Sequence, residues 1–137
     1  MGQRGVTMRN LSRITIGLAG AILGVCLGVA NSGWAGNVGR VSFAEDVFPI
    51  LQYRCLECHK AGAPGVAFSG LNLESYEGLM KGTRYGPVVV PGNAMVSNLN
   101  VLVEGRAGIR MPHNRKRLTP CEIDILRNWV NQGAKND

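Results

Sequence analysis

Near the C-terminus, apolar residues recur at the spacing of an amphipathic helix. They are Ile123, Ile125, Leu126, Trp129 and Val130. The four residues before them, Thr119-Pro120-Cys121-Glu122, form a capping box with proline at the favoured first helical position. Gly133 follows as a natural C-terminal stop. The pattern predicts a well-defined final helix with one buried face.

A second helix is predicted upstream, where another capping box precedes an apolar face. Ser42 is the expected N-cap and Glu45 the residue three positions later. The apolar face consists of Phe43, Val47, Phe48 and Leu51. Pro49 has no backbone N–H, so we expect a bend or a late start of the helix there. This helix runs directly into Cys55.

The segment between these helices alternates loops with short helices. Residues 60–70 have the composition of a loop, and residues 73–81 fit a short helix. Residues 82–93 contain several glycines and prolines and are again a loop, before a short helix over 97–104. Residues 105–118 form a basic loop. No stretch is a convincing strand, so the pattern predicts an all-α domain.

The N-terminus differs from the rest of the chain. Arg4, Arg9 and Arg13 precede an uncharged apolar run over residues 14–30, and Gly33-Trp34-Ala35 follows with small residues at the first and third positions. This order is typical of a secretory signal peptide. We predict cleavage after residue 35, a domain over 36–137, and export to the periplasm or an equivalent compartment. An uncleaved membrane anchor is the alternative, although the apolar run is short and glycine-rich for a span.

Charge gives little reason to expect a nucleic-acid partner. The whole chain has a formal net charge of +6, and loss of the three N-terminal arginines lowers it to +3. Basic and aromatic residues are not interleaved, and no nucleic-acid motif is present.

The chemistry is concentrated in Cys55-Leu56-Glu57-Cys58-His59, a Cys-x-x-Cys-His sequence typical of c-type haem attachment. Two thiols three residues apart on one helical turn reach the two vinyl groups of a single porphyrin, and each forms a thioether. The following histidine then lies below the iron and supplies an imidazole nitrogen. We therefore predict one covalent haem c, attached through Cys55 and Cys58 and ligated by His59.

Two other uses of the cysteine pair fit less well. A thioredoxin-like redox pair needs a βαβ context, which the pattern lacks. A zinc site would need Cys121 and His113 as further ligands, and these are unevenly spread along the chain. The predicted domain keeps three cysteines, an odd number that suits a disulfide framework poorly unless two are consumed by a cofactor.

For the second axial ligand the sequence offers Met111, in the basic loop. A thioether opposite a histidine is a common pairing that raises the reduction potential. His113 and Cys121 are the alternatives, giving a bis-histidine or a histidine–thiolate site. Met80 lies on an apolar helix face, as core methionines do, and Met95 lies beside a Pro-Gly turn.

Five cationic residues surround Met111: Arg106, Arg110, Arg115, Lys116 and Arg117. If Met111 binds the iron, this loop lies near the haem edge and can steer a redox protein with an acidic docking surface. A solvated basic loop and pairing with the haem propionates are the alternatives.

Beyond the haem motif, the chain resembles class I cytochromes c, and more closely the small cytochrome c domains of planctomycete proteins. The matching segments are 47–51, 55–59, 69–73, 79–82, 90–92, 97–99, 110–112, 118–120 and 129–134. The resemblance implies an all-α fold whose first and last helices cross, with Phe48 near Trp129. It also implies His59 and Met111 as axial ligands. The family usually has an acidic or other polar residue where this chain has Cys121.

The functional hypothesis is a one-electron carrier between redox proteins rather than an enzyme, because an iron with two protein ligands has no open position. One alternative is a haem enzyme or gas-binding sensor, such as a peroxidase, with a labile sixth ligand. Another is a haem subunit of a larger redox complex.

Overall fold

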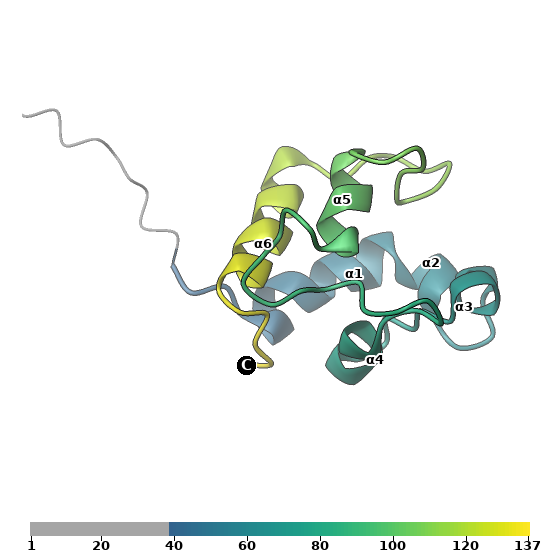
Figure 1. Ribbon diagram of the computed structural model, residues 1–137, viewed down its shortest axis with the longest axis horizontal. Helices are drawn as coiled ribbons and strands as arrows, with labels where there is room; N and C mark the ends of the chain where they lie inside the picture. The colour runs from purple at the N-terminus through teal and green to yellow at the C-terminus, as the bar shows by residue number, and fades with distance from the viewer. Residues whose placement is uncertain (1–38) are drawn as a thin grey trace, which may run out of the picture. The chain divides into compact units, whose positions relative to one another are not determined.

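The computed structural model describes residues 39–137, and all its regular elements are helical (Figure 1). They are η1 (Phe43–Val47, a π-helical turn), α1 (Phe48–Arg54), α2 (Leu56–His59), α3 (Pro64–Ser69), α4 (Tyr76–Lys81), α5 (Asn98–Glu104) and α6 (Pro120–Asn131). Strand-like pairing in this range is limited to one isolated bridge between Thr83 and Gly86. The expected all-α architecture is confirmed. The predicted signal peptide, residues 1–35, lies outside the described residues.

No helix within residues 39–137 combines the length and the apolar character that crossing a membrane requires.

The first helical segment begins at the predicted N-cap but with a wider turn than expected. The Ser42 hydroxyl accepts a hydrogen bond from the Glu45 N–H, at 3.2 Å. The reciprocal bond comes from Asp46 rather than Glu45, because the Asp46 carboxylate accepts from the Ser42 N–H at 2.8 Å. A π-helical turn adds a residue to each turn, which moves the returning carboxylate one position along. Pro49 lies in the first turn of α1, where the π-helical turn gives way to a regular α-helix, so the helical segment starts early and changes its winding at the proline.

An aromatic cluster joins this segment to α6. The Phe43 ring lies 5.6 Å from the Trp129 ring and 5.2 Å from the Tyr76 ring, measured between centroids. Phe48 contacts Phe43 at 5.9 Å and makes no such contact with Trp129, so Phe43 takes the place that the resemblance implied for Phe48. The reason is helical phase. Phe43 points inward with Val47, whereas Phe48 lies at the edge of that face and is half-buried.

The C-terminal helix forms as the sequence predicts. The Thr119 hydroxyl accepts from the Glu122 N–H at 3.2 Å, and the Glu122 carboxylate accepts from the Thr119 N–H at 2.6 Å. Its buried residues are Leu126, Trp129 and Val130. Side chains of this size stabilise a fold by roughly 1.5–3 kcal/mol each when fully buried. Helix α6 packs against both η1 and α5.

One predicted loop is a helix. Residues 60–70 contain α3, which starts at Pro64 and ends where Gly70 adopts a left-handed conformation, with φ of 79°. Proline at the start and glycine just past the end are ordinary helix boundaries. Gly65, inside the helix, favoured the loop prediction because glycine is a poor helix former. The next helix, α4, begins at Tyr76 rather than residue 73 because the Ser75 hydroxyl caps it by accepting from the Gly78 N–H.

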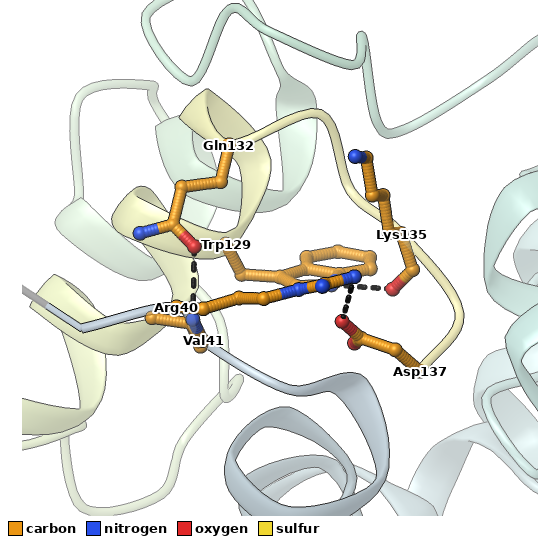
Figure 2. A pocket seen from close by; sticks show the side chains of 6 residues that line it. All are labelled: Arg40, Val41, Trp129, Gln132, Lys135 and Asp137. Atoms are coloured by element: carbon orange, nitrogen blue, oxygen red, sulfur yellow. Dashed lines mark hydrogen bonds and ion pairs between the residues drawn. The ribbon is translucent and has the colours of Figure 1, made fainter.

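The chain ends beside its first described residues (Figure 2). Arg40 forms an ion pair with Asp137 at 2.7 Å, and the Val41 N–H donates to the Gln132 side chain at 2.8 Å. The Trp129 indole N–H donates to the Lys135 carbonyl at 2.9 Å. These residues surround a cavity of about 320 Å³ that contains no cysteine, histidine or methionine. The junction therefore holds the two ends of the domain together and carries none of the candidate chemistry.

Candidate functional site

A second cavity, of about 370 Å³, contains the candidate chemistry. Its apolar lining includes Leu71, Leu73, Val88, Leu99, Leu102 and Val103. All three motif residues, Cys55, Cys58 and His59, also line it, as do Met111 and His113. We call this cavity the motif pocket. Its volume lies within the usual range for small-molecule and cofactor sites.

The backbone at the end of α1 presents the two thiols. Cys55 interrupts the helix, with φ of −124° and ψ of −36°, and its N–H still donates to the Leu51 carbonyl at 2.8 Å. The Cys55 carbonyl then accepts from the N–H groups of Cys58 and His59, at 3.1 and 2.9 Å. This single turn brings the two cysteines and the histidine to the lining of the motif pocket. Both thiols are half-buried and form no disulfide.

Burial keeps the Cys55 thiol protonated. Loss of solvent around the sulfur raises the pKa of Cys55 to about 12, an effect that the nearby Arg54 charge only partly offsets. The group is therefore a neutral S–H at physiological pH.

The His59 imidazole is oriented by the backbone. Its Nδ1 lies 3.1 Å from the Leu71 carbonyl oxygen, and because a carbonyl only accepts, Nδ1 carries the proton. The unprotonated Nε2 is then available to a metal. Metal-binding histidines usually donate their other N–H in this way, which fixes the ring and raises its basicity.

The candidates for the second ligand occupy different surroundings. Met111 is half-buried, packs against the core and donates its backbone N–H to the Leu102 carbonyl at 3.1 Å. His113 lines the same pocket but is exposed. Cys121 is exposed at the start of α6 and is absent from the pocket lining. Met80 packs against the core elsewhere, and Met95 is 68% exposed.

The alternative of a zinc site was also considered for the cysteine pair. Within residues 39–137, no group of three or more His, Cys, Asp or Glu side chains gathers in a way that would hold a metal ion.

Two ion pairs border the motif pocket. Arg54, which precedes Cys55, binds the Glu122 carboxylate through two nitrogens at 2.8 and 3.0 Å. This hydrogen-bonded guanidinium holds the pKa of Glu122 below its usual value. Arg115, in the basic loop, pairs with Glu57 inside the haem motif. Both pairs connect the motif segment to residues that lie more than fifty positions away in the sequence.

Three features of the site were not predicted from the sequence: the Leu71 carbonyl, Gly65 and the Arg54–Glu122 ion pair. The Leu71 carbonyl leaves no signal in a sequence, because any residue supplies a carbonyl. Gly65 lies in a segment that composition assigned to a loop. The sequence predicted Glu122 as a capping residue but not its ion pair with Arg54. That contact depends on how α1 and α6 are placed relative to each other.

These residues fit a covalent haem. Two unpaired thiols three residues apart, an imidazole whose Nε2 is left free and a thioether side chain meet around one mainly apolar cavity. The described part of the chain is all-helical, and its site has the side chains that a c-type haem needs.

The family follows from comparison. Residues 55–114 match the family model described as planctomycete cytochrome C. The match starts at the first motif cysteine and ends after the Met111 segment, leaving η1, α1 and α6 outside it. No curated protein and no solved structure matches this chain. Domains of this family typically hold covalent haem c and carry electrons.

Proposed function

We propose that this chain is an exported, monohaem c-type cytochrome that carries single electrons between redox proteins. The observation that carries the proposal is that His59 and Met111, from segments far apart in the sequence, line one apolar pocket with both motif thiols. The chain contains a single Cys-x-x-Cys-His sequence, which supports one haem. The charged and apolar order of residues 1–35 supports export.

When bound, haem c supplies an iron that gains and loses one electron. Cys55 and Cys58 would hold the group through thioethers, and His59 would ligate the iron through Nε2 while Leu71 fixes the ring. Met111 would be the second ligand, because it is the methionine that lines the pocket. Its thioether favours the reduced state and raises the reduction potential. The apolar lining excludes water from the iron.

The basic loop supports a partner with an acidic docking surface. Arg115 contributes to the pocket lining and pairs with Glu57, so the loop reaches the pocket. Lys116 and Arg117 follow it, are exposed, and form no ion pair with any residue in the range 39–137. Unpaired surface cations of this kind raise the rate at which an acidic protein finds the haem edge.

The first test is an absorption spectrum of the purified protein, oxidised and reduced, with a potentiometric titration and exposure of the reduced form to carbon monoxide. We expect a six-coordinate low-spin haem c, one per chain, a single one-electron wave and no carbon monoxide binding at neutral pH. A protein without covalent haem would refute the cofactor assignment. Rapid carbon monoxide binding would instead favour the gas-binding sensor, with His113 or another group as a labile ligand.

The partner proposal has its own test. Electron transfer to an acidic redox protein should be slower in Lys116→Ala than in the unsubstituted chain, and the difference should shrink as salt is added. Lys135→Ala removes the same charge beside the other cavity, away from the motif pocket, and serves as the matched control. Equal slowing in both variants would mean that total charge, not the basic loop, sets the rate.

A further inference from the structure

Helix α3 lies against the haem motif at a point where only glycine fits. A Cβ atom at Gly65 would lie 2.4 Å from the Cys58 carbonyl oxygen and 2.9 Å from Cε1 of His59. Side-chain Cβ atoms do not approach other atoms so closely, so any other residue would force α3 or the imidazole to move. Cε1 is the ring atom between the two nitrogens and is bonded to the one that faces the metal. The contact therefore bears on the orientation of the ligand.

A hydroxyl connects this contact to the other support of the ring. The Ser69 hydroxyl donates to the Gly65 carbonyl at 2.6 Å and accepts from the Leu71 N–H at 3.1 Å. Leu71 is the residue whose carbonyl accepts from Nδ1 of His59. One side chain thus ties the helix that touches the ring at Cε1 to the backbone that holds it at Nδ1. Gly65, Ser69 and Leu71 all line the motif pocket.

We propose that Gly65 and Ser69 are positioning residues of the axial histidine, acting with Leu71 as a bracket that fixes the rotation of the imidazole. The inference rests on the proposed role of His59 as an iron ligand. Gly65 sets how closely α3 approaches the ring, and Ser69 keeps the Leu71 carbonyl in line with Nδ1. The bracket acts on the ring and does not itself touch the iron.

The bracket has a consequence for the reduction potential. Donation from Nδ1 to a carbonyl makes the imidazole a stronger electron donor, which favours the ferric state. Widening the bracket lengthens that hydrogen bond and weakens the donation. A variant that lets α3 or the Leu71 carbonyl move away from the imidazole should therefore raise the midpoint potential of the haem and change the orientation of the ring.

The experiment compares the haem-loaded protein with Gly65→Ala and Ser69→Ala variants. We expect both to raise the midpoint potential and to shift the g-values of the ferric low-spin EPR signal, which depend on the orientation of the axial ligand. The Gly65→Ala shift should be the larger, because it adds an atom where there is no room. Ser69→Ala adds no bulk and keeps the test decisive if Gly65→Ala does not fold.

Two matched controls separate positioning from stability. Ala67→Gly weakens the same helix at an exposed position and should leave potential and g-values unchanged while lowering the melting temperature. Ser75→Ala removes a comparable capping hydroxyl from α4, outside the pocket lining. Unchanged g-values and potential in both bracket variants, or equal shifts in the controls, would overturn the proposal. Absence of a low-spin haem signal in the unsubstituted protein would refute the proposed function instead.

Discussion

The two segments that bring ligands to the motif pocket are built differently. The histidine segment, residues 54–71, is largely helical, and both the His59 ring and the turn that carries it are held by backbone groups. The methionine segment, residues 105–118, has no helix or strand, and its side-chain bonds to the rest of the domain come from Arg106 near its start and Arg115 near its end. Met111 is held there by one backbone hydrogen bond to Leu102 and by packing against the core.

This difference indicates which ligand can change. The hydrogen bond at Nδ1 and the closeness of α3 to Cε1 restrict the orientation of the His59 ring. A methionine in an irregular, exposed loop has a local free energy of opening well below that of the whole domain. In the proposed cytochrome, the histidine segment would therefore fix the position of the haem, and the methionine segment would set its reduction potential and its access to other ligands.

The largest effect is expected from removing the fixed ligand. In His59→Gly the imidazole is lost, and we expect the low-spin spectrum to disappear and carbon monoxide to bind the reduced protein. Free imidazole should restore the spectrum, because the Leu71 carbonyl and the space beside Gly65 remain to hold it. Spectra recorded across an imidazole titration check this. An unaltered spectrum in the variant would exclude His59 as the ligand.

Removing the adjustable ligand should have a smaller effect. In Met111→Ala we expect the haem to stay attached, the reduction potential to fall, and carbon monoxide to bind unless His113 takes the vacated position. Comparison with the double variant Met111→Ala/His113→Ala distinguishes these cases. The double variant should bind carbon monoxide in both, so a single variant that does not bind it indicates ligation by His113. Met95→Ala, a methionine exposed outside the pocket, is the control and should change neither potential nor spectrum. An unchanged potential in Met111→Ala would refute the assignment.

The histidine segment is more predictable from the sequence than the methionine segment, for a physical reason. The two cysteines and the histidine lie on one helical turn, so their relative positions follow from their spacing in the sequence. Met111 reaches the pocket only because η1, α5 and α6 pack together and carry the loop there. The sequence therefore left Met111, His113 and Cys121 as alternatives, and the fold separates them by exposure and place.

The helix boundaries show the same distinction between local and distant causes. The caps at Ser42 and Thr119 were predictable because each depends on residues no more than four positions away. Helix α3 was missed because its glycine is explained only by the His59 ring against it. A residue whose role is to leave room for another cannot be recognised before that neighbour is placed.

The Arg54–Glu122 pair should make stability depend on acidity. The pKa of Glu122 is lowered in the folded state, so its contribution is present above its usual value of 4.5 and is lost as the pH falls through the folded value. We expect Glu122→Gln to lower the unfolding free energy at pH 7 by roughly 1–3 kcal/mol, as for hydrogen bonds to charged groups. Denaturant unfolding should show this difference vanishing at low pH.

Asp124→Asn is the control for that measurement, because Asp124 is an exposed carboxylate in the same helix, paired with Arg127. It should change the unfolding free energy by less than about 1 kcal/mol. A Glu122→Gln variant whose deficit persists undiminished in acid would show that the amide disturbs the helix cap rather than the ion pair.

The smallest effect on stability is expected from the exposed ion pair that joins the two segments. Arg115 and Glu57 are 59% and 66% exposed, and exposed ion pairs contribute about 0.2–1 kcal/mol. A double-mutant cycle with Arg115→Gln and Glu57→Gln should therefore give a coupling energy below about 1 kcal/mol, vanishing in about 1 M salt, where screening acts over about 3 Å. A larger, salt-insensitive coupling would mean that the loop is locked to the haem motif. The methionine segment would then be as rigid as the histidine segment, and the contrast between them would fail.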